Sequence, residues 1–335
     1  MKIVWVTVPA DLVATASGVN SKVASVRYRA LMPAAGLRAL GHDTMVIGHD
    51  RNTLEQSRQA IVGADVVIFR RNYDEPECIE SLLGETAAAG VKTVFDLSDD
   101  RLHGRVGPHL RRMVELARAV VTTSEPLRQK IRDEYGKDAF VVGDPFEGPR
   151  GEPRWQPGPR LKALWFGHPV NLPSLEQSLP ALLQACRKKP MDLRIVTERV
   201  EGIERQCKDF NSKNRNLLSM RFAEWSNAET WRSLAEADLV VIPYIAGHPR
   251  SLAKSPNRII ESLWAGRFVV AQPIPSYLEF REWAWIDEDI AAGIGWLIDD
   301  PAAIVPRIAA AQQHILGTYS AERISAEWDN VCRQL

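Results

Sequence analysis

Short apolar runs rich in valine, isoleucine and phenylalanine recur through the first half of the chain, with longer helical patterns between them. Runs of this length and composition are typical of buried strands. Their alternation with helices predicts β-α units around a parallel sheet, that is, a Rossmann-like domain. The expected strands are Ile3–Val8, Thr44–Ile47, Val66–Phe69, Val91–Phe95, Val120–Thr123 and Phe140–Val142, and the expected helices include Ser25–Leu40, Cys78–Ala89 and Pro108–Ala117.

A segment rich in proline and glycine, Gly148–Arg160, interrupts both patterns and is expected to link two domains. The alternation then restarts, so the second half is predicted to be another doubly wound α/β domain. We place the N-terminal domain at residues 1–150 and the C-terminal domain at 160–318. The strands expected in the second domain are Leu161–Phe166, Asp192–Thr197, Leu218–Phe222, Leu239–Ile242, Phe268–Ala271 and Gly295–Leu297.

The end of the chain has a helical pattern over residues 301–316 and again over 320–334. Ile324, Trp328 and Val331 follow one another at helical spacing and form an apolar stripe that has to pack on something. We expect the helix at 320–335 to cross back onto the N-terminal domain.

Composition narrows the function classes. Lysine plus arginine (42) balances aspartate plus glutamate (42), so no field of the whole chain favours nucleic acid as a partner. The four cysteines are far apart and show no C-x-x-C spacing, which argues against a zinc site and against a disulfide framework. Neither a signal-peptide core nor an apolar stretch of about 18 residues is present. These features predict a soluble, cytoplasmic protein.

The strongest candidate for a binding site begins at Lys254. Ser255 followed by Pro256 is a helix-start signal, with the serine as the expected cap. The helix predicted over 256–265 leads into the strand Phe268–Ala271, so its N-terminus lies at the edge where open α/β sheets bind ligands.

Charged side chains recur along this helix at helical spacing. Lys254, Arg258 and Glu261 step by four and three residues, so the two helical members share a face. A cation at a helix N-terminus suits a diphosphate, and a carboxylate one turn deeper suits ribose hydroxyls. The alternative interpretation is a capped amphipathic helix with a surface ion pair.

From Lys254 to Ala271 the chain resembles the Lys-x-x-Asn-Lys/Arg-x-x-Glu-x-x-x-x-Gly-x-x-Val-Val signature of glycosyltransferase family 4 and its GT-B relatives. The resemblance implies two Rossmann-like domains facing across a cleft, an acceptor domain followed by a donor domain. It implies that Glu261 binds the nucleotide ribose and Lys254 neutralises the diphosphate. Many family members carry an acid eight positions before this glutamate, where this chain has Ala253. The remaining donor-binding candidates in this segment are Ser255, Asn257 and Arg258.

Further donor-side candidates come from the second half. Leu164–Pro169 resembles the strand and turn that open the GT-B nucleotide domain, which places Gly167 and His168 beside the donor, although a plain tight turn is the alternative. Trp225 matches a region near the base, where an aromatic ring could stack, or it could simply pack in the domain. Arg250 is a candidate for a second phosphate contact.

Acceptor-side candidates come from the first half. Ser25–Arg29 is similar to the first β-α turn of bacterial family members, so Arg27 and Arg29 are candidates to touch phosphate or an anionic acceptor; a solvated helix start is the alternative. The paired arginines at 70–71 and 111–112 also fall in this domain. A lipid-phosphate acceptor at the inner face of the membrane would explain them, and so would scattered solvated arginines.

The candidates for catalysis follow the strand Val91–Phe95. Asp96, Asp99 and Asp100 lie within five positions, and their mutual repulsion could raise a pKa and create a general base. We name Asp99 and Asp100, with His103, as the catalytic candidates. The alternative to a catalytic role is a structural one, in which this acidic turn caps the next helix. A metal site lacks its closing ligands, and no metal or other cofactor is expected.

The function predicted from these features is sugar transfer from a nucleotide-sugar donor to a glycan, lipid-linked or other hydroxyl acceptor, as in polysaccharide biosynthesis. A GT-B sugar-nucleotide epimerase or hydrolase and a non-catalytic GT-B binding module are the alternatives. The sequence has no G-x-S-x-G, H-E-x-x-H or P-loop motif, and no G-x-G-x-x-G follows the first strand, which disfavours hydrolases of those classes and dehydrogenases.

Overall fold

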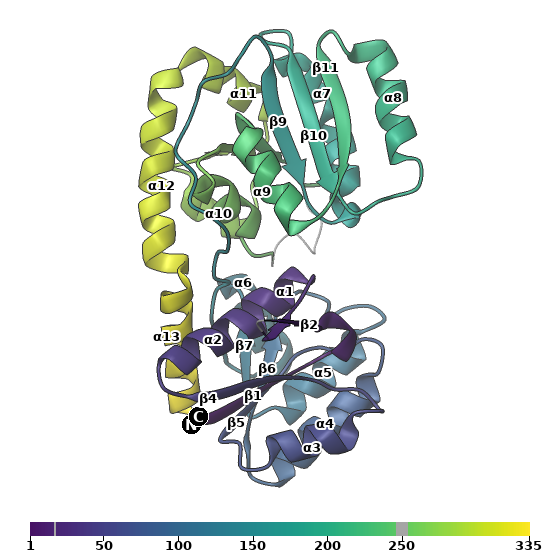
Figure 1. Ribbon diagram of the computed structural model, residues 1–335, viewed down its shortest axis with the longest axis vertical. Coiled ribbons are helices and arrows are strands. Elements are labelled where there is room, and N and C mark those ends of the chain that lie inside the picture. Colours follow the sequence, from purple (N-terminus) through teal and green to yellow (C-terminus); the bar gives the residue numbers. More distant parts are fainter. Residues whose placement is uncertain (17, 246–253) are drawn as a thin grey trace. The chain divides into compact units, whose positions relative to one another are not determined.

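The computed structural model describes residues 1–16, 18–245 and 254–335, and Figure 1 shows their helices and strands. Contacts divide the chain into two compact units. Met1–Phe146, Lys254, Ser255 and Thr318–Leu335 belong to the first, and most of the remaining residues between 147 and 317 form the second. Each unit has a parallel six-stranded sheet with helices on its faces, so the predicted α/β class with two Rossmann-like sheets is confirmed.

The first unit has the strand order β4-β1-β5-β6-β7-β8. A small antiparallel hairpin of β2 (Val13–Thr15) and β3 (Gly18–Asn20) follows the first strand. The sheet strands are β1 (Lys2–Thr7), β4 (Asp43–Gly48), β5 (Val66–Phe69), β6 (Lys92–Leu97), β7 (Ala119–Thr122) and β8 (Ala139–Val141). The helices are α1 (Ala24–Val26), α2 (Met32–Ala39), α3 (Leu54–Ile61), α4 (Pro76–Ala88), α5 (Gly107–Leu116), α6 (Glu125–Tyr135) and α13 (Ala321–Gln334).

The helix predicted over 25–40 is interrupted by one wide turn. Between α1 and α2 the residues Arg27–Leu31 form a π-helical turn. Pro33 stands in the first turn of α2 and has no N–H to donate to the carbonyl of Arg29, which is the physical reason why the regular ladder does not run through.

The apolar stripe of the last helix packs inside the first unit. Ile324, Trp328 and Val331 are buried, and the rings of Trp328 and Trp5 meet edge to face with their centroids 6.0 Å apart. Helix α13 thereby covers one face of the first sheet together with α2, and Ser320 caps it by accepting a hydrogen bond from the N–H of Arg323 at 3.2 Å.

The second unit has the strand order β11-β10-β9-β12-β13-β14. Its strands are β9 (Leu161–Phe166), β10 (Met191–Thr197), β11 (Leu218–Glu224), β12 (Leu239–Ile242), β13 (Phe268–Ala271) and β14 (Trp285–Ile286). Its helices are α7 (Leu172–Ala185), α8 (Ile203–Asn214), α9 (Asn227–Glu236), α10 (Asn257–Trp264), α11 (Ile290–Asp299) and α12 (Ile304–Tyr319).

One predicted strand is wrong. Residues 295–297 lie inside α11, and the sixth strand is β14. The run from 290 to 298 is apolar throughout, so periodicity alone could not separate a buried helix from a buried strand. The helix forms because Asp289 caps it, accepting a hydrogen bond from the N–H of Ala292 at 2.8 Å. Gly293 lets it approach Trp285, whose ring would collide with any side chain there.

The segment expected as an interdomain linker packs along the second unit. The N–H of Gly151 donates to the carbonyl of Trp264 at 2.9 Å, and the N–H of Arg154 donates to the carbonyl of Gly266 at 3.2 Å. The indole N–H of Trp264 donates to the carbonyl of Gly148 at 3.1 Å. Residues 148–160 are thus held by ordered hydrogen bonds to the second unit.

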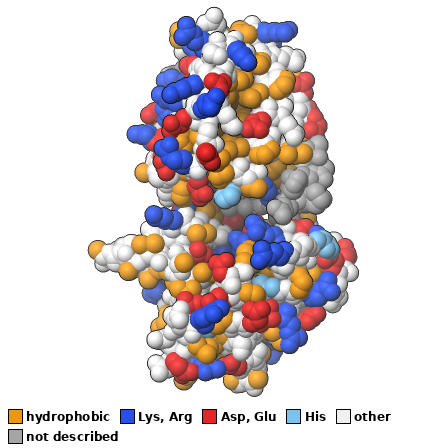
Figure 2. Space-filling view, turned by 90° about the vertical axis from the view of Figure 1, so that its right-hand side faces the viewer, with side chains coloured by type: hydrophobic (Ala, Val, Ile, Leu, Met, Phe, Trp, Pro, Cys, Tyr) orange, Lys and Arg blue, Asp and Glu red, His pale blue; other side chains and the backbone are white. Residues whose placement is uncertain are grey.

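On the face that Figure 2 shows, lysine and arginine side chains are interspersed with aspartate and glutamate. This agrees with the formal net charge of zero. Among the helices of the described residues, none combines the length and the apolar character needed to cross a bilayer.

Candidate functional site

The strand order of the second sheet locates a ligand crevice. Starting from β9, the chain first adds β10 and β11 on one side and then returns to add β12 on the other. Successive connections therefore diverge at the carboxyl ends of β9 and β12, and open α/β sheets bind ligands at such a switch point. Gly167 and His168 follow β9 directly, which places both of these predicted donor-side residues at this point.

Arg258 is held at the same point. From the first turn of α10, its Nη2 donates to the hydroxyl of Tyr244 at 2.6 Å and its Nη1 to the carbonyl of Phe166 at 3.4 Å. The guanidinium carbon also lies 5.1 Å from the centre of the Tyr244 ring. A Cβ added at Gly167 would lie 3.4 Å from Nη1 of Arg258, so the glycine leaves room for this cation beside the end of β9.

Tyr244, which holds Arg258, is itself held by a second tyrosine, Tyr277. The hydroxyls of Tyr244 and Tyr277 are 3.1 Å apart, and Tyr277 is completely buried. Burial raises the pKa of Tyr277 well above its usual range, so its hydroxyl stays protonated and can donate. The result is a rigid, positively charged group at the carboxyl edge of the second sheet.

The rest of the predicted donor segment surrounds the start of α10. Lys254, Ser255, Asn257 and Glu261 are all half-buried. The expected cap is wrong by one residue, because Pro256 and not Ser255 occupies the N-cap position. A proline side chain cannot accept a hydrogen bond, so the N-cap residue itself does not cap this helix start. The N-terminus of a helix favours an anion.

The other donor-side candidates are placed less centrally. The ring of His168 is exposed and accepts a hydrogen bond from the N–H of Val170 at 3.2 Å. Trp225 is half-buried after β11, and its N–H donates to the carbonyl of Thr197 at 2.8 Å, so it lies at the same edge of the sheet two strands away from β9. Arg250 lies outside the described residues.

The two acceptor-side candidates of the first unit are buried and support the fold. Arg29 is 0% exposed and donates to Asp96, to the carbonyls of Val142 and Gly143, and to Asp144, at distances from 2.5 to 3.2 Å. Arg27 donates to the carbonyls of residues 21 and 22, both at 3.0 Å. The expectation that these arginines face a ligand is therefore corrected: the π-helical turn directs them into the unit.

The two aspartates among the catalytic candidates each have a cationic partner, and the histidine has a carboxylate partner. Asp99 pairs with Arg71 at 3.2 Å, Asp100 with Lys130 at 2.6 Å, and His103, whose side chain is 72% exposed, with Glu134 at 3.0 Å. Asp96, the third carboxylate of the acidic turn, is taken by Arg29. The mutual repulsion that suggested a general base is thus offset, because each of the three carboxylates has a cation beside it.

The first sheet has its own switch point, which the sequence pattern did not reveal. The chain adds β4 on one side of β1 and β5 on the other, so the connections diverge at the carboxyl ends of β1 and β5. Asp11 follows β1, and Arg70 and Arg71 follow β5 directly. In the sequence, 70–71 stood out only as a basic pair; its neighbour across the switch point is 59 residues earlier in the chain, and only strand order brings them together.

In the described part of the chain, no three histidine, cysteine, aspartate or glutamate side chains converge closely enough to hold a metal ion.

Comparison with solved structures covers both units. The fold is similar to that of Anabaena HepE, solved in complex with UDP, at a TM-score of 0.69 and 14% identity over 100% of both chains. The chain has the GT-B fold. Other GT-B structures similar to it are a glycosyltransferase from Rickettsia africae (TM-score 0.67, 14% identity, 99% of this chain and 98% of that one) and TarM from S. aureus (TM-score 0.60, 14% identity, 80% and 55%). No known family model matches the sequence of this GT-B chain, and no curated protein matches it.

Proposed function

We propose that this GT-B chain is a glycosyltransferase that moves a sugar from a nucleotide-diphosphate donor to a hydroxyl acceptor. The observation that carries the proposal is Arg258, a cation fixed by Tyr244 and the Phe166 carbonyl at the switch point of the second sheet, beside Gly167. HepE, a chain of similar fold, has been solved with UDP and with UDP-glucose, which supports a nucleotide-sugar donor here.

In this reaction the acceptor oxygen attacks the anomeric carbon while the bond from that carbon to the diphosphate breaks. Negative charge then develops on the departing diphosphate. Arg258, Lys254 and the N-terminus of α10 would stabilise that charge, and Glu261 would hold the ribose hydroxyls, as the resemblance to family 4 implies. For an inverting outcome Asp99 or Asp100 would take the acceptor proton, which requires either one to leave the cation it pairs with.

The roles of the two units follow from the same proposal. The second unit would bind the donor and the first the acceptor, which is a glycan, a lipid-linked sugar or another hydroxyl compound. No cofactor is needed for a displacement of this kind, because fixed cations can take the place of a metal ion at the leaving group.

Calorimetric titration with UDP, GDP, ADP, CMP and dTDP tests the donor site. We expect one nucleotide to bind, and Arg258→Gln and Glu261→Ala each to weaken that binding by about tenfold or more, the value of one lost charge-assisted contact. Arg205→Gln is the matched control, because Arg205 lies on α8 with a side chain that is 87% exposed. Binding of no nucleotide, or unchanged binding to Arg258→Gln, would refute the assignment.

Product analysis tests the reaction class. With the nucleotide sugar that binds, we expect release of the nucleoside diphosphate to depend on added acceptor. Rapid hydrolysis or epimerisation of the donor without any acceptor would exclude transfer as the main activity.

A further inference from the structure

The switch point of the first sheet places charged side chains of both signs at one edge. Asp11 ends the short 3-10 turn after β1, and Arg70 and Arg71 are the first two residues after β5, the strand next to β1. Because ligands of doubly wound sheets bind where the connections diverge, this is the expected ligand position of the first unit. We call Asp11, Arg70 and Arg71 the Arg70 site.

Arg70 is a buried cation with one long ion pair and an unsatisfied hydrogen-bond donor. It is 3% exposed, and its Nε has no hydrogen-bond partner among the described residues. The nearest carboxylate oxygen belongs to Asp96, 3.6 Å from that nitrogen. Asp96 is already bound by Nε and Nη2 of Arg29. Burial lowers the pKa of Arg70, and Asp96 offsets this only in part. Buried charges are ordinarily paired and hydrogen-bonded, so the position calls for an anion from outside the chain.

Two further groups lie at the same edge. Arg71 pairs with Asp99 and lies over the ring of Tyr73, with its guanidinium carbon 4.7 Å from the ring centre. Asp11 is half-buried; burial raises its pKa, while the nearby Arg70 and Arg71 lower it. The Arg70 site therefore offers guanidinium donors for an anion and a carboxylate that can accept a hydrogen bond from a hydroxyl group.

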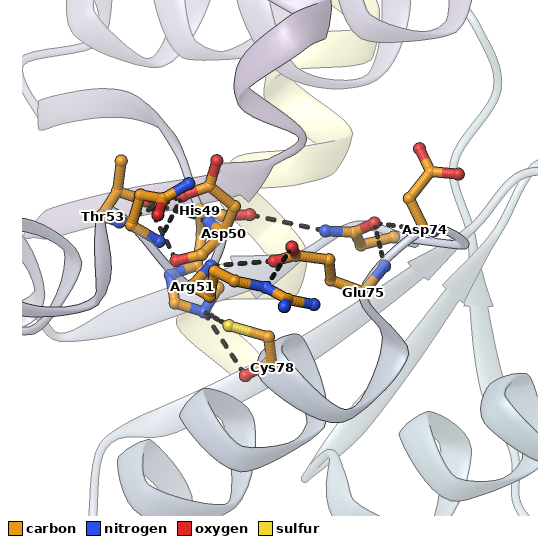
Figure 3. Close-up of polar contacts among 9 residues, drawn as sticks. His49, Asp50, Arg51, Thr53, Asp74, Glu75 and Cys78 are labelled. Atoms are coloured by element: carbon orange, nitrogen blue, oxygen red, sulfur yellow. Dashed lines mark hydrogen bonds and ion pairs between the residues drawn. The ribbon is translucent and has the colours of Figure 1, made fainter.

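The loop that presents these arginines is firmly held. Asn72 is 1% exposed and accepts hydrogen bonds from the N–H groups of Asp74 and Glu75 at 3.0 and 3.1 Å. Glu75 in turn pairs with Arg51 from the loop after β4 at 2.6 Å. Figure 3 shows these contacts, with the carboxylate of Asp74 directed away from them. The site is thus preorganised, which reduces the entropy lost on binding.

We propose that the Arg70 site binds a hydroxylated ligand that bears an anionic group, a sugar acid or a sugar phosphate, and that the acceptor of the reaction proposed above is of this class. Arg70 binds the anionic group and Arg71 adds a second positive charge beside it. Asp11 accepts a hydrogen bond from a neighbouring hydroxyl group of the ligand. Only the identification of this ligand as the acceptor rests on the proposed function. The binding site itself follows from residues of the first unit.

Calorimetry on the full chain tests it with three probes: methyl glucuronide, glucose 6-phosphate and the neutral methyl glucoside. At least one anionic probe is expected to bind tenfold or more tightly than the neutral one, and which of them does so separates a carboxylate from a phosphate ligand. Arg70→Met is expected to remove the preference, whereas Arg258→Gln and the exposed control Arg112→Met retain it. Equal binding of all three probes to the wild type overturns the proposal.

Thermal unfolding separates a ligand-binding role of Arg70 from a structural one. Because its charge is poorly compensated in the free protein, Arg70→Met is expected to unfold at the same temperature as the wild type or higher. A lower unfolding temperature together with a retained anion preference overturns the proposal. If Arg70→Met does not fold, Arg71→Met decides instead, with a tenfold loss of preference expected and no loss counting against the site.

The two proposals fail separately. A wild type that binds a nucleotide but shows no anion preference refutes the Arg70 site alone. An anion preference that depends on Arg70, in a chain that binds no nucleotide, retains the site and refutes its role as an acceptor site.

Discussion

Replacing Arg29 with methionine removes the guanidinium that joins three segments of the first unit. Arg29 comes from the π-helical turn before α2, Asp96 from β6, and Val142, Gly143 and Asp144 from the segment after β8. Arg29 and Asp96 have side chains that are 0% exposed. The substitution keeps much of the side-chain volume but leaves buried carboxylate and carbonyl oxygens without their donor.

The cost follows from this geometry. Breaking a buried ion pair by removing one partner costs about 3–5 kcal/mol, and Arg70, 3.6 Å from Asp96, offsets only part of the charge left behind. Against a total stability of about 5–15 kcal/mol this is a large fraction. At about 1.4 kcal/mol per factor of ten, amide exchange governed by global opening should accelerate at least about a hundredfold.

Hydrogen exchange measured on peptides from β6 and β7 reports on the first unit alone, which avoids assuming that the whole chain unfolds in one step. Arg58→Met is the matched control. Arg58 pairs with Glu55 and Glu85, but its side chain is 41% exposed, so little loss of stability is expected. If Arg29→Met accelerates exchange no more than Arg58→Met does, the buried network contributes little and our account of Arg29 is wrong.

Three other predictions concern the cores and the loops. Trp328→Ala should cost the first unit about 3–5 kcal/mol, because the ring is fully buried against Trp5, and an unchanged urea midpoint would contradict this. Burial lowers the pKa of His49, so its contribution to stability is present at neutral pH and is lost as the pH falls below about 6.5 towards the lowered native value. The urea midpoint of a His49→Gln variant should therefore change less between pH 7.5 and 5 than that of the wild type. An equally large change would argue against this role of His49. Gly266→Ala should lower the melting temperature, since φ is +75° and the new Cβ would meet the carbonyl of residue 152. Gly84→Ala, inside α4 with open space around it, should instead stabilise the protein by about 0.5–1 kcal/mol. Equal melting temperatures of the two variants would count against both expectations.

Much of the fold was predictable from local patterns. Val66–Phe69 and Leu239–Ile242 are continuous apolar runs bounded by polar or special residues, and Leu161–Phe166 departs from this pattern only at Lys162. The three strands have these same bounds. A strand buried on both faces leaves such a run in any context. The run around 295–297 is equally apolar, and it became a helix because of a capping aspartate and close packing, which are not visible in hydrophobicity.

The candidate site was predictable where its residues are close in sequence. Arg258 and the helix that carries it were named from the Ser255-Pro256 start signal, from helical spacing and from the resemblance to family 4. By contrast, Arg27 and Arg29 looked like surface cations, and Arg70 looked like one more arginine. Their environments depend on Asp96, which is 67 residues away from Arg29, and on which strand lies next to β1.

The sequence by itself therefore determined the alternation of strands and helices, the existence of two α/β halves and the cation at the start of α10, because these follow from interactions within a few residues. Only the tertiary structure decided which arginines are hydrogen-bonded within the fold and which are buried with fewer partners. Strand order sets which loops meet at a sheet edge, and burial sets what a charge there requires; both are products of contacts between distant parts of the chain.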